Sequence, residues 1–209
     1  MGYNNAKIYK STLEAALNNV TKNKVELKSQ ISLNSWLELK KALNPINNYI
    51  TEKLTRKFIK SLPNLLKKTK DPSLGDVRKN IKKLLKANEL INTNANGYDF
   101  FYSPIIAEVK ANIPYDNTRY GSSQKSGLTK DIAGLLVPGS KDKKNEIKLK
   151  NNYKFLVVLD YNRDKCNTLE AVKDLKNKSN YSKKIEIIED IKKTQQLNKK
   201  MLYIVMLGL

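Results

Sequence analysis

The sequence contains no histidine and only one cysteine, Cys166. These two absences exclude zinc sites built from histidine or from several cysteines, catalytic triads that use histidine, and any internal disulfide. Acid–base chemistry in this protein therefore has to come from carboxylates, lysine, tyrosine or a water molecule bound to a metal.

Long apolar segments are also missing. No run approaches the ~18 residues that span a bilayer, and the first ten residues, MGYNNAKIYK, lack the apolar core of a signal peptide. Gly2 follows Met1, but the sixth position is Ala6, where a myristoylation motif has Ser or Thr. The sequence therefore predicts a cytoplasmic protein without a membrane segment.

Acidic residues are few relative to basic ones. Lys and Arg number 40 against 20 Asp and Glu, which gives a net charge of +20. The segment from Lys53 to Lys86 contains twelve basic residues and only two acidic ones, a local net charge of +10. A charge of this size on a folded domain favours a polyanionic partner, with nucleic acid as the first candidate and an anionic membrane surface as the second. A lysine-rich surface in contact with solvent alone is the alternative explanation.

The spacing of apolar residues divides the chain into a mainly helical part, 1–90, and a mixed part, 91–209, within a single domain, 1–209. Intervals of three or four residues predict helices around 11–20, around 33–43, over 46–62 with Pro45 near the first turn, and over the segment that follows DPSLG. After NTNANG, the pattern predicts two strands within 98–113, a helix from Gly121 to about Leu136 and a buried strand at 153–161. A helix at 183–198 and a final strand follow, while VPGSKDKKNEIKLKNN is predicted to be a basic loop or loose hairpin.

The segment GYDFFYSPIIAEVKA carries the most informative residues. If 98–102 and 105–111 pair as a hairpin that turns at Ser103-Pro104, opposed residues have numbers that sum to 207, and Asp99 faces Glu108. Opposed Cβ atoms lie about 4.5–5.5 Å apart. Lys110 shares the face of Glu108, because side chains alternate along a strand. Two carboxylates this close repel each other unless a cation lies between them, so the pattern predicts a metal-dependent phosphodiesterase centre.

The order of hairpin, helix and buried strand, with D-x8-E-x-K on the hairpin, resembles the PD-(D/E)xK nuclease superfamily, whose best-known members are the type II restriction endonucleases. The resemblance covers roughly 98–161 together with a helix upstream. It implies an α/β (α+β) fold, in which helices flank a central mixed sheet and the helical N-terminal region is an addition. The sequence departs from the family pattern at Tyr98, where members often have proline.

The resemblance also implies roles for individual residues. Asp99 and Glu108 would ligate one or two Mg²⁺ ions, assisted by the main-chain carbonyl of Val109. Lys110 would position the attacking water or stabilise charge on the phosphorus. A hairpin loop of odd length would turn Asp99 away and leave Asp116 as the alternative acid. No organic cofactor is expected.

Two further residues are candidates for the same site. Glu52 lies in the helix before the sheet, where members of the superfamily can carry a glutamate that points to the metal; a pair with Arg56 at i+4 is the alternative. Gln124 lies four residues before Leu128 on the inward face of the next helix, where some members place a glutamine near the metal-bound water or the phosphate. Its alternative role is to bond free backbone N–H groups at the start of that helix.

The basic helices of the first part are expected to contact the phosphate backbone of DNA. Base recognition is expected from the loop and helix start after the second strand, with Asn117, Arg119, Gln124 and Lys125 as candidates, and KDKKNEIKLKNN as a second region. The expected function is a sequence-specific double-stranded DNA endonuclease of the restriction type, acting as a homodimer on palindromic sites. The alternatives are a Holliday-junction resolvase or DNA-repair nuclease with the same chemistry, and a non-catalytic basic nucleic-acid-binding protein.

Overall fold

The computed structural model describes residues 10–11, 13–18, 26–27, 32–86, 98–114, 118–137, 146–162, 166–193 and 195–209. The chain divides into two compact units, Met1–Ile46 and Asn47–Leu209. In the first unit, residues 10–11 and 13–18 are helical, and the carboxylate of Glu14 accepts a hydrogen bond from the backbone N–H of Leu27 at 2.8 Å. Helix α2, Leu33–Leu65, begins in this unit and continues into the second.

The second unit is built on a mixed sheet of five strands in the order β1-β2-β3-β5-β4. The strands are β1 Phe100–Tyr102, β2 Ile105–Lys110, β3 Tyr153–Leu159, β4 Ile185–Ile188 and β5 Leu202–Leu207. Strand β1 is antiparallel to β2, and the other neighbouring strands are parallel. The predicted α/β class, with a mixed sheet flanked by helices and further helices towards the N-terminus, is confirmed.

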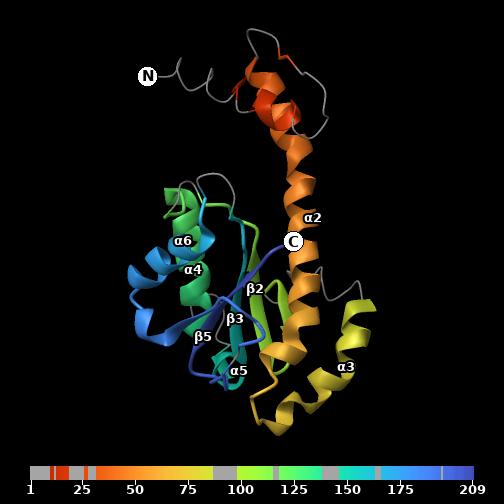
Figure 1. The fold of residues 1–209 in the computed structure, drawn as a ribbon, viewed down its shortest axis with the longest axis vertical. Helices are drawn as coiled ribbons and strands as arrows, with labels where there is room; N and C mark the ends of the chain where they lie inside the picture. The colour runs from red at the N-terminus through yellow and green to blue at the C-terminus, as the bar shows by residue number, and fades with distance from the viewer. Residues whose placement is uncertain are drawn as a thin grey trace. The chain divides into compact units, whose positions relative to one another are not determined.

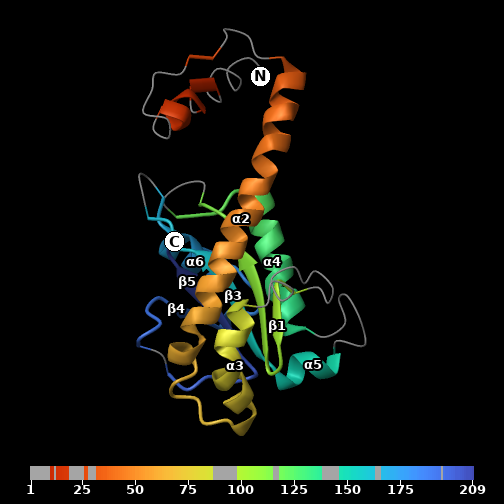
Figure 2. The same ribbon diagram turned by 90° about the vertical axis from the view of Figure 1, so that its right-hand side faces the viewer.

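Helices cover both faces of this sheet (Figure 1). The second part of α2 and helix α3, Gly75–Lys86, lie on one face, and α4, Ser122–Leu136, and α6, Thr168–Asn177, lie on the other, as the turned view in Figure 2 also shows. The short elements are α5 Glu146–Asn151 and the 3₁₀ helices η1 Pro72–Leu74 and η5 Ser182–Lys184. Among the described helices, none combines the length and the apolar character that crossing a membrane requires.

Alternation along the strands divides the core into two layers. On β2, Ile105, Ala107 and Val109 pack in the cluster that contains Phe58 of α2, and Ile106 packs in the cluster that contains Leu128 of α4. Strands β3 and β5 are buried along their whole lengths, which explains their continuous apolar sequences and confirms the predicted central strand.

Three predictions about secondary structure are wrong. Helix α2 runs through Pro45. A proline inside a helix removes one backbone hydrogen bond and crowds the preceding turn, at a cost of about 3 kcal/mol, and the apolar face that the second part of α2 buries in the core offsets this cost. Residues 183–198 contain η5 and strand β4 instead of a helix, since Ile185 and Ile187 pair with Leu202 and Ile204 of β5. Residues 146–151 of the expected basic loop form α5, while 138–145 lie outside the described residues.

Helix α6 was not predicted, although its start has a sequence signal. The side chain of Asn167 accepts a hydrogen bond from the backbone N–H of Glu170 at 3.2 Å, which caps the first turn of the helix. Ala171, Val172 and Leu175 then bury one face of the helix against the sheet.

Candidate functional site

The hairpin register is the one that the sequence predicts. Phe100 pairs with Ala107, Phe101 with Ile106 and Tyr102 with Ile105, and each pair of numbers sums to 207. The two residues of the turn are Ser103 and Pro104, joined by a cis peptide bond. Asp99 immediately precedes β1, so it lies at the position opposite Glu108.

Asp99 is held at the end of the hairpin by the backbone of β2. Its Oδ2 accepts a hydrogen bond from the N–H of Val109 at 2.8 Å. Strand β1 begins at Phe100, so the Asp99 carboxylate satisfies a backbone donor beyond the end of the β1 ladder. The N–H and C=O of one strand residue point to the same side. The carbonyl of Val109 is therefore directed to the edge where Asp99 lies.

Lys110 brings the charged residues together. Its Nζ lies 3.3 Å from Oε2 of Glu108 and 3.9 Å from Oδ2 of Asp99. Burial alone would lower the pKa of Lys110, but the neighbouring carboxylates outweigh this effect, so its pKa is raised and the side chain is positively charged at neutral pH. The three residues that the sequence singled out therefore lie in one cluster.

A third carboxylate belongs to this cluster and was missed by the sequence analysis. Oδ2 of Asp131, on α4, lies 3.2 Å from Nζ of Lys110. The helical spacing contains a signal for it, because Asp131 follows Leu128 by three residues and precedes Leu135 by four, and both leucines are buried against the sheet. The link to Lys110 had no local signal, since 21 residues separate them in the sequence.

Glu108 is the most strongly perturbed acid of the cluster. The residue is 8 % exposed, and this burial is the main cause that raises its pKa to about 8. Lys110 acts in the opposite direction, whereas the charges of Asp99 and Asp131 raise the pKa further. The site therefore holds more negative charge than its one lysine neutralises.

Replacing Glu108 by glutamine is expected to stabilise the protein at neutral and alkaline pH. An unfolded glutamate ionises near pH 4.5 and the folded Glu108 near pH 8, so the folded state binds more protons between these values. The stability of the wild type then falls as pH rises through that window. The difference between Glu108→Gln and the wild type should grow by at least about 1.4 kcal/mol, the equivalent of one pKa unit. Urea unfolding at a series of pH values, without divalent metal, measures it; a difference that stays constant with pH would contradict the raised pKa.

A polar cavity of about 540 Å³ opens beside the cluster, between the middle of α2 and the start of α4. Asp99, Val109 and Lys110 form one side of it. The other lining residues are mainly amides and small side chains: Asn47, Asn48, Thr51, Ala111, Asn112, Ile113 and Gln124. A cavity of this size lies within the usual range for ligand sites, about 300–1,000 Å³.

Gln124 reaches this cavity and also caps its own helix. Its Oε1 accepts a hydrogen bond from the backbone N–H of Gly121 at 3.3 Å. The two roles considered for Gln124 are therefore compatible, because the bond to Gly121 occupies the amide oxygen and leaves the NH₂ group as a donor.

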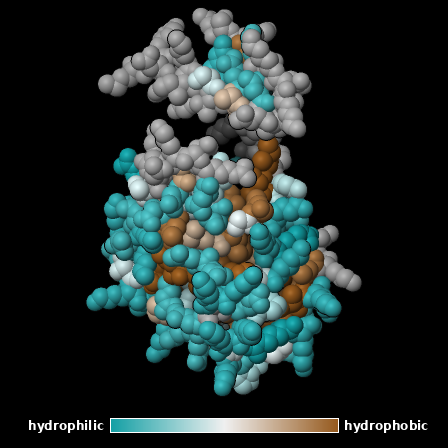
Figure 3. Space-filling model, viewed as in Figure 1, coloured by the Kyte–Doolittle hydropathy of each residue, from teal (hydrophilic) through white to brown (hydrophobic). Residues whose placement is uncertain are grey.

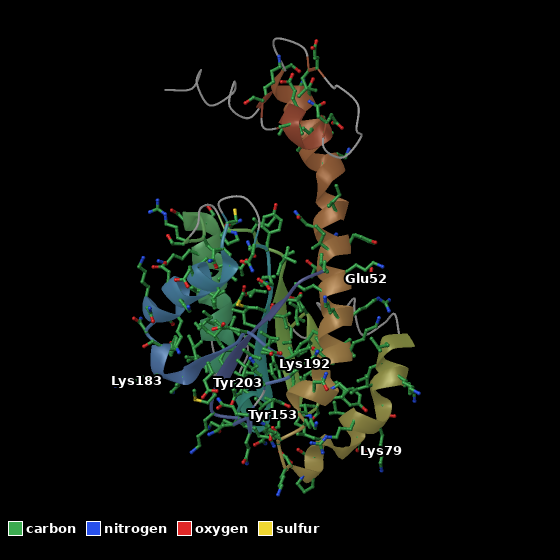
Figure 4. The ribbon with its side chains drawn as sticks, viewed as in Figure 1. Glu52, Lys79, Tyr153, Lys183, Lys192 and Tyr203 are labelled. Carbon is green, nitrogen blue, oxygen red and sulfur yellow. The ribbon has the colours of Figure 1, made fainter. Side chains whose placement is uncertain are left out.

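Glu52 is not brought to the cavity. It projects from α2 (Figure 4), and its Oε1 accepts a hydrogen bond from Nε of Arg56 at 2.9 Å. Arg56 in turn donates to the backbone carbonyl of Leu85 on α3 at 2.9 Å. The residue that α2 directs into the cavity at this level is Thr51, one position earlier.

Three of the residues expected to recognise bases, Arg119, Gln124 and Lys125, lie on or near the start of α4. Arg119 is exposed. Nζ of Lys125 lies 3.7 Å from Oδ2 of Asp174 on α6. Asn117 and the alternative acid Asp116 lie outside the described residues.

Two carboxylates and a backbone carbonyl are the groups that could hold a metal ion. In the part of the chain that the structure describes, no group of three or more acidic, histidine or cysteine side chains has the geometry to hold one. Any metal at the cavity would therefore rest on Asp99, Glu108 and the carbonyl of Val109, with water completing its shell. Comparison with known proteins gives no assignment, since no family model, no curated protein and no solved structure matches this chain.

Proposed function

We propose that this protein is a Mg²⁺-dependent endonuclease that hydrolyses phosphodiester bonds in double-stranded DNA, with the site-specific action of a type II restriction enzyme. The observation that carries the proposal is the convergence of Asp99, Glu108 and Lys110 beside a polar cavity. The order of hairpin β1-β2, helix α4 and parallel strand β3 is consistent with the resemblance to the PD-(D/E)xK nucleases.

The donor groups of the site fit Mg²⁺. Carboxylate and carbonyl oxygens are the hard ligands that Mg²⁺ prefers, and one or two carboxylates with several waters are its usual protein environment. Burial raises the pKa of Glu108 and the charges of Asp99 and Asp131 raise it further, and a divalent cation would favour the ionised carboxylate by adding positive charge next to it. When bound, Mg²⁺ would act as a Lewis acid, lowering the pKa of a water molecule and neutralising charge on the phosphate.

The side chains of the chain itself would act on the scissile phosphate from one side of the cavity. The raised pKa keeps Lys110 positively charged at neutral pH, so its ammonium group can stabilise negative charge that develops on the phosphorus. Gln124, which also lines the cavity, can donate its NH₂ group to a phosphate oxygen or a water molecule. The cavity amides of Asn48 and Asn112 suit contacts with base edges, because each amide has both donors and an acceptor.

The basic helices on the α2 side of the sheet are suited to the phosphate backbone. Exposed lysines recur along the second part of α2 and along α3, namely Lys53, Lys57, Lys60, Lys79, Lys82 and Lys83. Hydrophilic residues cover much of the described surface seen in Figure 3. Contacts of this kind supply affinity without sequence information. A homodimer on a palindromic site, with one active site for each strand, completes the proposal.

Cleavage of long duplex DNA tests this function. Purified protein incubated with DNA and Mg²⁺ is expected to give discrete bands on a gel, and EDTA is expected to abolish them. A smear would indicate a nonspecific nuclease, and cleavage of branched DNA alone would indicate a Holliday-junction resolvase. DNA binding without cleavage of any substrate would refute the enzymatic function and leave a nucleic-acid-binding protein.

A further inference from the structure

The ammonium group of Lys110 is surrounded by carboxylates that come from two different elements. Glu108 and Asp99 belong to the hairpin, at 3.3 and 3.9 Å from Nζ. Asp131 belongs to helix α4 and lies at 3.2 Å, the shortest of the three distances. Glu108 and Asp131 lie within hydrogen-bond distance of the ammonium group, and Asp99 interacts with it through charge at a longer distance.

Asp131 lies close to Lys110 without lining the cavity. Asp99 contributes to the lining of the cavity, whereas neither Glu108 nor Asp131 is among the lining residues, and 17 % of the Asp131 side chain is exposed. Its position is set by the packing of α4, because Leu128 and Ile132 on the same helix are buried against the sheet. Asp131 is thus a carboxylate that α4 holds next to Lys110, outside the lining of the cavity.

This arrangement matters because lysine has a long, flexible side chain that loses conformational entropy when it is ordered. If a cation engages Asp99 and Glu108, it competes with Lys110 for their negative charge and repels its ammonium group, so both of these ion pairs weaken. Among the described residues, Asp131 is then the acidic partner of Lys110 that shares no charge with the cation.

We propose that Asp131 is a positioning residue, whose carboxylate holds the ammonium group of Lys110 beside the scissile phosphate while Asp99 and Glu108 bind the metal. This inference rests on the proposed nuclease function. It assigns to Asp131 no contact with the metal or the substrate, so its whole effect on the reaction passes through Lys110.

Steady-state cleavage kinetics test the inference. Asp131→Asn is expected to lower kcat roughly 10- to 100-fold, the usual cost of removing a group that orients a catalytic residue, with KM for DNA unchanged. Asp131→Glu keeps the charge and is expected to retain most of the activity. In a Lys110→Ala background, Asp131→Asn is expected to cause no further loss. The matched control is Asp190→Asn, which removes a surface pair with Lys193 and should leave kcat unchanged.

A second measurement does not depend on activity. Because Asp131 and Lys110 form an ion pair, we expect the shifts in unfolding midpoint caused by Asp131→Asn and Lys110→Met, measured without metal, not to be additive in the double variant. Additive shifts, or an equal loss of kcat by Asp131→Asn with and without Lys110, would overturn the inference alone. Coupled midpoints in a protein that cleaves no nucleic acid would overturn the proposed function, and with it the catalytic purpose of the pair.

Discussion

Glu108→Gln, Asp99→Asn and Lys110→Ala are each expected to lower Mg²⁺-dependent DNA cleavage by at least about 10²-fold, the cost of removing one electrostatic group from a phosphoryl-transfer site. The carboxylates of Glu108 and Asp99 lie within 3.9 Å of the ammonium nitrogen of Lys110, at the end of β2. Each supplies a separate part of the chemistry, since the two acids would hold the metal and the lysine would neutralise charge on the phosphate. Initial rates on a duplex that the wild type cuts measure the effect.

DNA binding by these variants should remain close to that of the wild type. The affinity for duplex DNA is expected to come mainly from the many exposed lysines of α2 and α3, so a gel-shift assay in Ca²⁺ or without metal should give similar dissociation constants. A large loss of binding together with activity would show that the cluster holds DNA instead of catalysing its cleavage.

Glu52→Gln is the matched control for Glu108→Gln. The exchange is the same, but Glu52 accepts its hydrogen bond from Arg56 and does not line the cavity. An exposed i,i+4 pair on a helix is worth about 0.3–0.5 kcal/mol, so Glu52→Gln should cleave DNA within a few-fold of the wild-type rate. A loss as large as that of Glu108→Gln would mean that the assignment of the site to the hairpin alone is incomplete.

Asp71→Ala is expected to lower the free energy of unfolding by about 2–4 kcal/mol, the range for breaking a charged network with several partners. Oδ2 of Asp71 accepts hydrogen bonds from the hydroxyl of Tyr153 and from Nζ of Lys199, both at 2.8 Å. Oδ1 accepts from the backbone N–H of Ser73 at 2.9 Å. The carboxylate therefore ties the segment between α2 and α3 to the starts of β3 and β5, two parallel strands of the central sheet. Thermal or urea unfolding measures the loss, roughly 2–4 °C for each kcal/mol in a protein of this size.

The same network makes the stability of the protein depend on pH in the acidic range. Hydrogen bonds from Lys199, Ser73 and Tyr153 hold the pKa of Asp71 far below its usual value of 3.8. A carboxyl with a lowered pKa stabilises the fold above the pKa of the unfolded chain, and this contribution is lost as pH falls below about 4 towards the folded value. Asp71→Asn should therefore lose less stability on acidification than the wild type.

Asp76→Asn is the control for both Asp71 variants. Asp76 is an exposed acid in the first turn of α3, where a carboxylate contributes about 0.3–1 kcal/mol through the helix dipole. If Asp71→Ala costs no more than Asp76→Asn, the network around Tyr153 and Lys199 does not stabilise the protein in solution.

The hairpin and the two buried strands were predictable because their signals are local. A two-residue turn at Ser103-Pro104 sets the register of residues on either side of it. This register alone brings Asp99 opposite Glu108 and puts Lys110 on the same face. The apolar runs of β3 and β5 are equally direct, since strands buried on both faces need apolar side chains at every position.

The region between β3 and β5 shows where such signals fail. Ile185, Ile187 and Ile188 fit either a strand or one face of a helix. These residues form a strand because they pair with β5, and β5 begins only at Leu202, so no local pattern indicates the pairing. Helix α6 was missed because the capping signal at Asn167 is short, and its apolar face becomes evident only against the sheet.

The candidate site divides in the same way. Asp99, Glu108 and Lys110 are neighbours on one hairpin, so strand geometry and turn length were sufficient to bring them together. Asp131 lies in the cluster and Glu52 does not. The difference depends on which side of α4 and of α2 packs against the sheet, since the apolar faces of these helices are buried on its opposite faces. Contacts along one hairpin follow from the order of its residues, whereas contacts between distant elements depend on the packing of the whole core, which no local pattern encodes.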